Sequence, residues 1–238
     1  MTTTTGIGSL DTVVFDVPDP ETSARFWETF LGGTRSSVED DWITVVTPDR
    51  WGLGFQLAPD LVAPQWPSSE RPQQLHLDVR VLDLAVSTEQ AVSLGATLLQ
   101  ENASWNTLAD PAGHPFDIVV NAEVSGPTLF GVMFDVPDAH AAAAFWSAVL
   151  GDPVTYDQDG MAMLGGERPV LFQQVESYVA PEWPDPAKPQ QGHLDLEVAD
   201  LDTAEAAALA AGATRLPGGG ETFRVFADPA GHPFCLCG

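Results

Sequence analysis

The chain has 238 residues, and its 34 Asp and Glu against 9 Lys and Arg leave a formal net charge of −25. This charge excludes a protein that binds nucleic acid or an anionic membrane surface electrostatically, because both need clustered cations. Hydrophobic residues make up 44% of the chain, with 7 Trp and 12 Phe, which is too many core-forming side chains for a disordered protein.

A strand and a helix are predicted first. The stretch Thr12–Val17 has the alternation of a strand. Asp19 followed by proline is typical of a helix N-terminus, and apolar residues at helical spacing continue up to Gly32, where the helix should end. Two further strands are predicted at Asp41–Thr47 and Trp51–Ala58.

A second strand–helix unit follows. The strand His76–Val81 places His76, Asp78 and Arg80 on one face and three apolar side chains on the other. The predicted elements after it are a helix at Leu84–Leu94 that ends at Gly95, and strands at about Thr97–Gln100, Trp105–Ala109 and Phe116–Asn121.

The same pattern occurs twice in the chain. The recurring segments are Phe15–Asp19 with Phe134–Asp138, His76–Asp78 with His193–Asp195, and Asp110–Phe116 with Asp228–Phe234. Two modules, 1–122 and 128–238, are therefore predicted, with a linker at 123–127, and each module should contain two βαβββ units. Because the linker is short, we expect the modules to pack as a pseudo-twofold pair, like a dimer within one chain.

The order of these motifs resembles the vicinal oxygen chelate superfamily, which includes glyoxalases, bleomycin-resistance proteins and extradiol dioxygenases. The motifs are a helix ending in Phe-Trp-x-x-x-Leu-Gly, then His-Leu-Asp, then Asp-Pro-Ala-Gly-His-Pro-Phe, each present twice. The resemblance implies an α+β fold with a cupped eight-stranded mixed sheet per module, helices outside and a small-molecule cavity inside. Function varies within such a fold and has to be argued from the site.

The resemblance also implies positions for metal ligands, and several of them are altered. Thr12 and Gly131 stand where a first-strand histidine is expected in the family. The first cavity should hold His76 and Asp117 as metal ligands with Gln56 as a weak third, and the second His193, Cys235 and Gln173. Because a tight divalent site needs three or four good ligands, we expect no cofactor or a weakly held divalent metal, and no nucleotide cofactor.

His76 and His193 are the candidate catalytic bases. Each is followed two residues later by a carboxylate, Asp78 or Asp195, at about 6 to 7 Å along the same strand face. Such a carboxylate raises the pKa of a histidine or orients its tautomer, as general-base catalysis requires. The alternative is a purely structural histidine. For His114 and His232, which lie in the Asp-Pro-Ala-Gly-His turns, a structural role is expected, and His140 should lie on the surface.

Three function classes remain open: an enzyme of the lyase or isomerase type, a protein that sequesters a small drug or metabolite, and a metal-free scaffold. In the second class the acidic chain would favour a cationic, aromatic ligand. The candidate substrate-binding residues are Gln56, Arg80, Trp51, Trp66, Trp105, Gln173 and Trp183. For Trp66 and Trp183, which lie in the Pro-rich connections, the alternative is that they hold a long loop on the core.

The two cavities should differ in ligand preference. The first combines His76 with the cation Arg80, which suits a substrate anion, whereas the second has Glu197 and replaces the final acid with Cys235. We therefore expect chemistry in the first module and binding of a neutral or cationic group in the second.

The remaining expectations concern the setting of the protein. The first ten residues lack the pattern of a secretory signal, and Cys235 and Cys237 are too close together to close a loop, so a reducing cytoplasm is predicted. The expected partner is a small-molecule ligand, with no nucleic acid and no membrane, and the expected state is a monomer or loose dimer.

Overall fold

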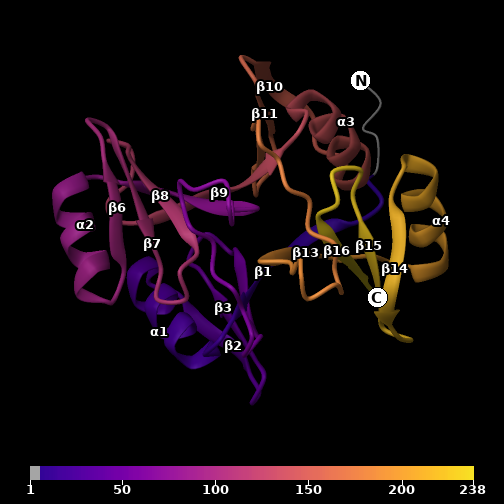
Figure 1. Cartoon of the computed structure of the whole chain (residues 1–238), viewed down its shortest axis with the longest axis horizontal. Coiled ribbons are helices and arrows are strands. Elements are labelled where there is room, and N and C mark those ends of the chain that lie inside the picture. Colours follow the sequence, from indigo (N-terminus) through magenta and orange to yellow (C-terminus); the bar gives the residue numbers. More distant parts are fainter. Residues whose placement is uncertain (1–5) are drawn as a thin grey trace. The chain divides into compact units, whose positions relative to one another are not determined.

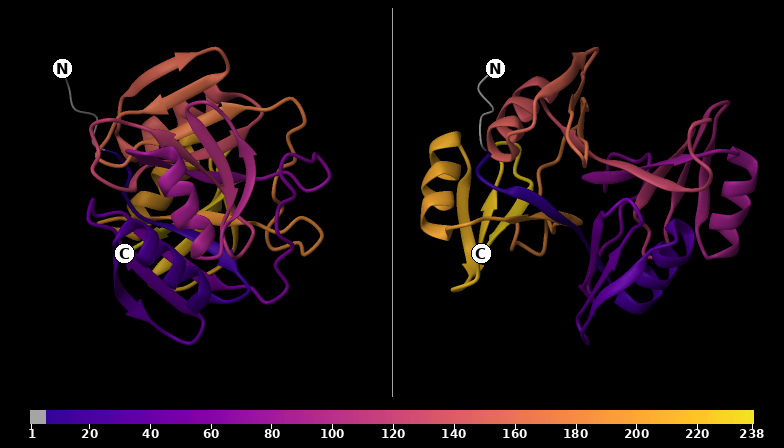
Figure 2. Two further views of the ribbon diagram at one scale, coloured as in Figure 1. Left: turned by 90° about the vertical axis from the view of Figure 1, so that its left-hand side faces the viewer. Right: turned by 180° about the vertical axis from the view of Figure 1, so that it is seen from behind.

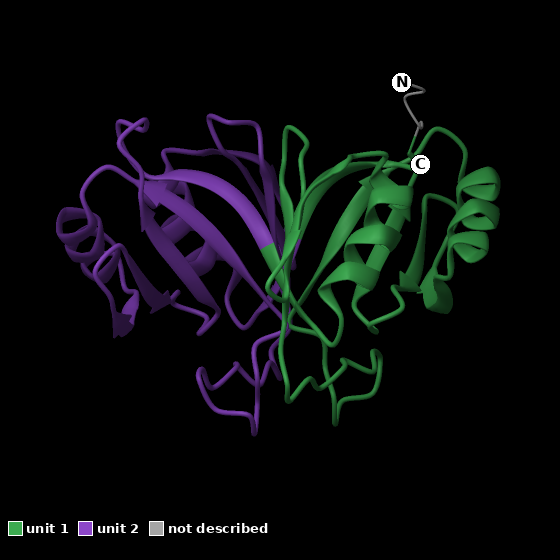
Figure 3. Cartoon of the chain, turned by 90° about the horizontal axis from the view of Figure 1, so that it is seen from above, with its two compact units in different colours: residues 1–13, 133–238 green, residues 14–132 purple. Residues whose placement is uncertain are grey.

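The structure, a computed structural model, describes residues 6–238 and contains two compact units (Figure 3). Unit 2 is Val14–Val132, and unit 1 comprises residues 6–13 together with Met133–Gly238. The strands β1 and β9 each begin in one unit and end in the other. The units therefore follow the sequence repeat except for the first strand of each copy.

Residues 6–238 contain sixteen strands and four helices, which Figure 1 shows as arrows and coiled ribbons. The helices are α1 (Pro20–Leu31), α2 (Leu84–Ser93), α3 (Ala139–Leu150) and α4 (Leu201–Ala211). The strands of the first repeat are β1 (Ser9–Val17), β2 (Thr34–Val38), β3 (Trp42–Val46), β4 (Gly52–Leu57), β5 (Leu75–Val81), β6 (Thr97–Glu101), β7 (Trp105–Ala109) and β8 (Pro115–Val120). Those of the second repeat are β9 (Thr128–Val136), β10 (Val154–Gln158), β11 (Met161–Leu164), β12 (Val170–Gln174), β13 (Gly192–Glu197), β14 (Thr214–Gly219), β15 (Phe223–Ala227) and β16 (Pro233–Cys237).

The strands form two eight-stranded mixed sheets, as the α+β prediction requires. Their strand orders are β14-β15-β16-β13-β1-β4-β3-β2 and β10-β11-β12-β9-β5-β8-β7-β6. The pairs β5–β8 and β13–β16 are parallel, and the hairpins beside them are antiparallel. Each sheet contains strands of both repeats, which differs from the expectation of one sheet per module.

Helices cover one face of the strands within each unit. In unit 2, α1 packs on β2–β4 and α2 on β6–β8 (Figure 1). In unit 1, α3 packs on β10–β12 and α4 on β15 and β16, and Figure 2 shows α4 beside its strands from behind. None of the helices in residues 6–238 has the length and apolar character needed to cross a membrane.

The repeated Phe-Trp and Asp-Pro-Ala-Gly-His motifs meet in the core. In unit 2 the indole of Trp27 donates a hydrogen bond to Asp110 Oδ2 at 3.1 Å, and its ring centroid lies 5.0 Å from that of Phe116. The other oxygen of Asp110 accepts from the backbone N–H groups of Ala112 and His114, both at 2.9 Å. The motif therefore closes a turn and ties it to the helix.

Both turn histidines have the expected structural placement. His114 is 1% exposed, and its Nε2 lies 2.8 Å from the backbone oxygen of Asp16. His232 is equally buried, between Asp228 and the hydroxyl of Tyr178. His140 is exposed and pairs with Asp157, so its surface position is also as expected.

The main difference between the predicted and the observed local structure is strand β2. Its sequence, Thr-Arg-Ser-Ser-Val, contains few strand-forming residues, and no strand was predicted there. The chain is extended at this position because β2 pairs with β3, with Thr34 opposite Val46. Strand β1 is also longer than predicted, since it starts at Ser9 and not at Thr12.

Candidate functional site

A cluster of His76, Asp78 and Asp117 lies in unit 2. His76 and Asp78 come from β5, whose apolar side chains Leu77 and Val79 are fully buried on the opposite face. Asp117 comes from β8, the parallel neighbour of β5, and is the register partner of Asp78. The strand alternation therefore turns these three polar side chains to one face of the sheet.

The cluster is tighter than the sequence indicated. His76 Nε2 lies 3.4 Å from Asp78 Oδ1 and 3.9 Å from Asp117 Oδ2. The expected separation of 6 to 7 Å is the spacing along the strand, and the two side chains close it by leaning toward each other. His76 is 5% exposed, so these contacts are shielded from water.

The carboxyl group of Asp117 has a raised pKa. Burial raises its pKa, and the repulsion from Asp78 acts in the same direction. The charge of His76 and a hydrogen bond of 2.6 Å from the hydroxyl of Thr107 act against this, but the net pKa of Asp117 stays above its ordinary value. Asp117 therefore takes up a proton more readily than a carboxyl group in water.

Gln73 contacts the second ring nitrogen of His76. Its Nε2 lies 3.1 Å from His76 Nδ1, so with the amide in this orientation Nδ1 accepts and the ring proton of a neutral imidazole lies on Nε2, facing the two carboxylates. If the amide is turned over, its oxygen accepts a proton from Nδ1 and Nε2 becomes the free base. One side chain thus supports both states of the histidine.

The three residues also fit a divalent cation. One ligand atom from each of His76, Asp78 and Asp117 lies within 4.8 Å of the others. One nitrogen and two carboxylate oxygens form a donor set used by zinc, manganese and iron, with further positions left for water or substrate. The sequence predicted His76 and Asp117 as ligands but assigned Asp78 only to orienting the histidine. Its register opposite Asp117 is the reason that it joins them.

Unit 1 has a related cluster of His193, Asp195 and Cys235. His193 Nε2 lies 3.4 Å from Asp195 Oδ1, and Gln190 Nε2 lies 3.4 Å from His193 Nδ1. Cys235 takes the place of the second carboxylate, opposite Asp195 in the register of β13 and β16. Burial and then the charge of Asp195 raise the pKa of the Cys235 thiol far above its ordinary value, so at neutral pH this position carries no charge.

The two glutamines do not lie in the sheets of the clusters to which they were assigned. Gln56 is in β4, whereas His76 and Asp117 are in the other sheet. Gln173 is in β12, again in the other sheet from His193, and its amide donates to Asp135 Oδ1 at 2.6 Å. The two βαβββ halves of a repeat thus belong to different sheets, and the grouping of each glutamine with its cavity stays a prediction.

The four candidate tryptophans occupy different environments. Trp51 is 2% exposed and belongs to the core of unit 2, which corrects its assignment as a ligand-stacking residue. Trp105, in β7, is 41% exposed. Trp66 is half-buried and lines a cavity of about 450 Å³ together with Leu99 and Pro115. Trp183 is half-buried against Gly218. Trp66 and Trp183 therefore both have contacts with the rest of their unit, and Trp105 is the most exposed of the four.

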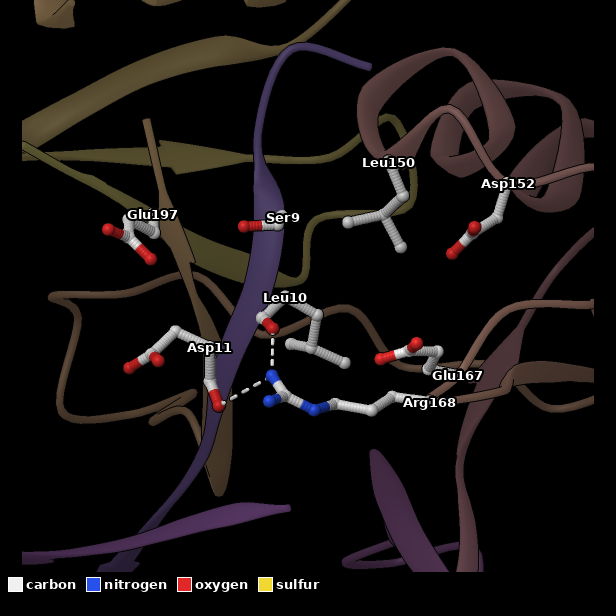
Figure 4. Close-up of a pocket in the computed structure, with 8 residues that line it drawn as sticks. All are labelled: Ser9, Leu10, Asp11, Leu150, Asp152, Glu167, Arg168 and Glu197. Carbon is white, nitrogen blue, oxygen red and sulfur yellow. Dashed lines mark hydrogen bonds between the residues drawn. The ribbon is translucent and has the colours of Figure 1, made fainter. Parts of the chain in front are cut away.

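Unit 1 also has an acidic cavity of about 330 Å³ (Figure 4). Its lining residues are Ser9, Leu10, Asp11, Leu150, Asp152, Glu167, Arg168 and Glu197. Arg168 extends across it and donates hydrogen bonds to the backbone oxygens of Leu10 and Asp11. Burial and the charge of Glu167 raise the pKa of Asp152 above its ordinary value. Sequence reasoning singled out only Glu197 here, because Arg168 and Glu167 lie in a turn without a recognisable motif.

The family model for a glyoxalase-like domain matches the chain twice, at residues 12–119 and 131–237. Among solved structures, glyoxalase I from Zea mays is similar, with a TM-score of 0.66 and 17% identity over 96% of this chain and 92% of that one. A putative dioxygenase from Bacillus subtilis subsp. subtilis str. 168 has a TM-score of 0.60 and 11% identity, over 98% of this chain and 86% of that one. No curated protein sequence matches this chain. At these identities the structures support the fold, and the family match covers most of both repeats, so the chain belongs to the glyoxalase-like family of the vicinal oxygen chelate superfamily as a tandem protein.

Proposed function

We propose that unit 2 binds a small organic molecule against the His76 cluster and transfers a proton on it, in a reaction of the lyase or isomerase type. The observation that supports this most is the position of His76 Nε2, between Asp78 Oδ1 at 3.4 Å and Asp117 Oδ2 at 3.9 Å. Two carboxylates at this distance stabilise the imidazolium that forms when the ring accepts a proton.

The proton transfer would use the free-base form of His76. Nε2 takes a proton from a carbon or oxygen of the substrate, and the electron pair stays on the substrate. The imidazolium, held by Asp78 and Asp117, then returns the proton to another atom of the same molecule, which completes an isomerisation. If it returns the proton to a leaving group, the reaction is an elimination. In both forms Nδ1 carries a proton, which it donates to the side-chain oxygen of Gln73.

A divalent cation fits the same cluster. When bound, it would supply Lewis acidity toward a substrate oxygen. His76, Asp78 and Asp117 would hold it, and in that state His76 is a ligand and not the base. The two uses of His76 exclude each other, so the proton-transfer proposal concerns the protein without metal.

The test is deuterium uptake from D₂O into hydroxyacetone, pyruvate and phenylpyruvate, followed by proton NMR with the metal-free protein. We expect uptake into at least one compound, and a loss of about 100-fold or more in His76→Gln, because general-base catalysis contributes on this scale. His140→Gln, at an exposed histidine, is the matched control and should keep the full rate.

Substitution of His193 provides the comparison between the two units. We expect His193→Gln to retain most of the uptake, because the neutral Cys235 thiol replaces one of the two carboxylates in its cluster. An equal loss in His76→Gln and His193→Gln would contradict the assignment of chemistry to unit 2. No uptake by the native protein, or full uptake in His76→Gln, would contradict the proton-transfer proposal as a whole.

The second candidate function is sequestration of a cationic molecule by unit 1 without chemistry. It is favoured by the cavity that carries Asp11, Asp152, Glu167 and Glu197, since Arg168 is the only cation among its lining residues. Calorimetric titration with phenethylamine tests it. We expect binding that weakens in Glu197→Gln and is unchanged in Glu176→Gln, an exposed position elsewhere in unit 1.

The cellular setting is part of the proposal. Cys235 and Cys237 are both free thiols, and burial first and then the charge of Asp195 raise the pKa of Cys237 to about 12. Two protonated, unbridged thiols are consistent with a reducing compartment, so we propose a cytoplasmic protein that acts as a monomer or loose dimer.

A further inference from the structure

A row of four side chains crosses the neighbouring strands β7, β8, β5 and β9 beside the His76 cluster. Val119 in β8 is the register partner of both Arg80 in β5 and Trp105 in β7. Phe130 in β9 completes the row, because the guanidinium carbon of Arg80 lies 3.7 Å from the centre of its ring. We call these residues, Trp105, Val119, Arg80 and Phe130, the Arg80 row.

The Arg80 row is accessible and lies on the same face as the cluster. Arg80 follows His76 and Asp78 at alternate positions of β5, so the three side chains share one face. Trp105 is 41% and Val119 37% exposed, and Arg80 and Phe130 are half-buried. Two aromatic rings and a valine therefore form an apolar surface around one cation.

Arg80 has no partner carboxylate among residues 6–238, although the chain has 34 Asp and Glu against 9 Lys and Arg. By contrast, Arg35 and Arg224 each pair with two carboxylates. Stacking on Phe130 holds the guanidinium plane, and the N–H groups at its edge stay available to an acceptor. A carboxylate is the acceptor that matches this fork, because it takes two parallel hydrogen bonds.

The equivalent row in unit 1 has the opposite charge. Glu197 stands at the position of Arg80, and its register partner Cys237 is opposite Phe223, at the position of Trp105. Asp11 in β1 occupies the position of Phe130 in the repeat, and it lines the acidic cavity together with Glu197. The same sheet positions therefore present a cation on an aromatic ring in one unit and two carboxylates in the other.

We infer that the Arg80 row binds the carboxylate of a small organic acid with an aromatic or branched apolar body, and so selects the substrate class of unit 2. The inference rests on the proposed small-molecule site at His76. Arg80 holds the carboxylate, and Trp105, Val119 and Phe130 contact the apolar body. The unreacting end of the ligand is then fixed while its other end reaches toward His76.

The experiment is calorimetric titration at pH 7 of the metal-free protein with phenylacetate, with phenylacetamide as the neutral match of the same shape. We expect phenylacetate to bind about tenfold more tightly than the amide, since a hydrogen bond to a charged group contributes on this scale. Arg80→Gln should remove the difference by weakening phenylacetate alone. Arg71→Gln, which removes the same charge from an exposed loop, should leave both affinities unchanged.

A second variant separates the apolar contact from the charge. Trp105→Ala should weaken phenylacetate and phenylacetamide by the same factor, because it removes ring contact and no charge. Trp105 is 41% exposed and lies outside the buried core, so this variant should fold, and circular dichroism checks each protein before titration.

Two results would overturn the inference: no phenylacetate binding by the native protein at millimolar concentration, or equal affinity in the native protein and Arg80→Gln. The titration involves no turnover and no metal, so it measures the Arg80 contact independently of the proposed reaction. Arg80-dependent binding without deuterium uptake would therefore contradict only the proposed reaction, whereas uptake without Arg80-dependent binding would contradict only the inference.

Discussion

At the scale of single residues, Asp228 is a buried carboxylate that accepts several hydrogen bonds within unit 1. Its Oδ2 accepts a hydrogen bond of 3.0 Å from the Trp146 indole and lies 3.4 Å from His232 Nδ1. Its Oδ1 accepts from the backbone N–H groups of Ala230 and His232. Burial raises the pKa of Asp228, but the charge of His232 and these hydrogen bonds outweigh burial and leave the pKa below its ordinary value.

Asp228→Asn should lower the free energy of unfolding at pH 7 by about 2 kcal/mol, because in either orientation the new amide nitrogen would face an N–H donor, of Trp146 or of the backbone. A carboxyl group whose pKa is lowered in the folded state stabilises it above the unfolded pKa of about 3.9, and this stabilisation is lost as the pH falls through the folded value. Urea unfolding at pH 7 and pH 3 measures the difference, which should shrink at the lower pH. Glu176→Gln, the exposed control, should change little at either pH, and a constant difference for Asp228→Asn would contradict the assignment.

The metal content of the isolated protein is a second prediction at this scale. Each cluster offers three donors and lacks a fourth, because Thr12 and Gly131 supply no strong ligand at the first-strand positions. Purification without chelators should therefore yield well below one equivalent of zinc, iron, nickel or manganese by elemental analysis. Near one equivalent would show that the expectation of weak binding is wrong, and loss of that metal in Asp117→Asn would locate it.

At the scale of elements, both long helices start and end with the same chemistry. Asp19 before α1 accepts from the backbone N–H groups of Glu21 and Thr22, and Asp138 before α3 accepts from Ala141. Gly32 and Gly151 end the two helices in the left-handed conformation, with φ of 69° and 76°. These local signals explain why the helix boundaries follow from the sequence.

Gly32→Ala should lower the free energy of unfolding by about 1 kcal/mol, because a side chain at positive φ is strained. A Cβ at this position would meet no atom within 4 Å, so the cost is that of the backbone conformation alone. Chemical denaturation measures it, and Gly32→Asn should cost less, since asparagine tolerates this conformation better. Gly126→Ala is the matched control: it also has open space but no positive φ, and it should be neutral. Equal effects of Gly32→Ala and Gly126→Ala would contradict the argument.

At the scale of the whole molecule, the dominant feature is the net charge of −25. Ion pairs such as Arg35 with Glu21 involve few of the acidic residues, so most carboxylates repel one another across the surface. The repulsion falls when salt shortens the screening length to about 10 Å at 0.1 M.

Raising NaCl from 10 to 300 mM should therefore raise the melting temperature by roughly 2 to 4 °C, which corresponds to about 1 kcal/mol for a chain of this size. Differential scanning calorimetry measures it, and KCl at the same ionic strength should give the same shift. A melting temperature that falls with salt would mean that attractive ion pairs outweigh the repulsion. The expectation that the two modules pack as a pseudo-twofold pair also belongs to this scale and stays a prediction.

The sequence by itself determined the repeat, the order of strands and helices, and the polar face of β5. These features follow from interactions within a few residues: strand alternation, an aspartate before each helix, a glycine after it, and the Asp-Pro-Ala-Gly-His turn. The same local chemistry was enough for the structural roles of His114 and His232. Strand β2 was not predicted from it, because its pairing with β3 and not its composition makes it a strand.

Tertiary structure decided which distant residues meet. Parallel pairing of β5 with β8 brings Asp117 to Asp78 and makes the His76 cluster, and the strand order places Gln56 in the other sheet. The placement of Phe130 under Arg80 and the burial of Trp51 were equally beyond sequence reasoning. Contacts of this kind depend on how whole strands pair and pack, which no local pattern encodes, so the sequence predicted the residue types of the site but not their grouping.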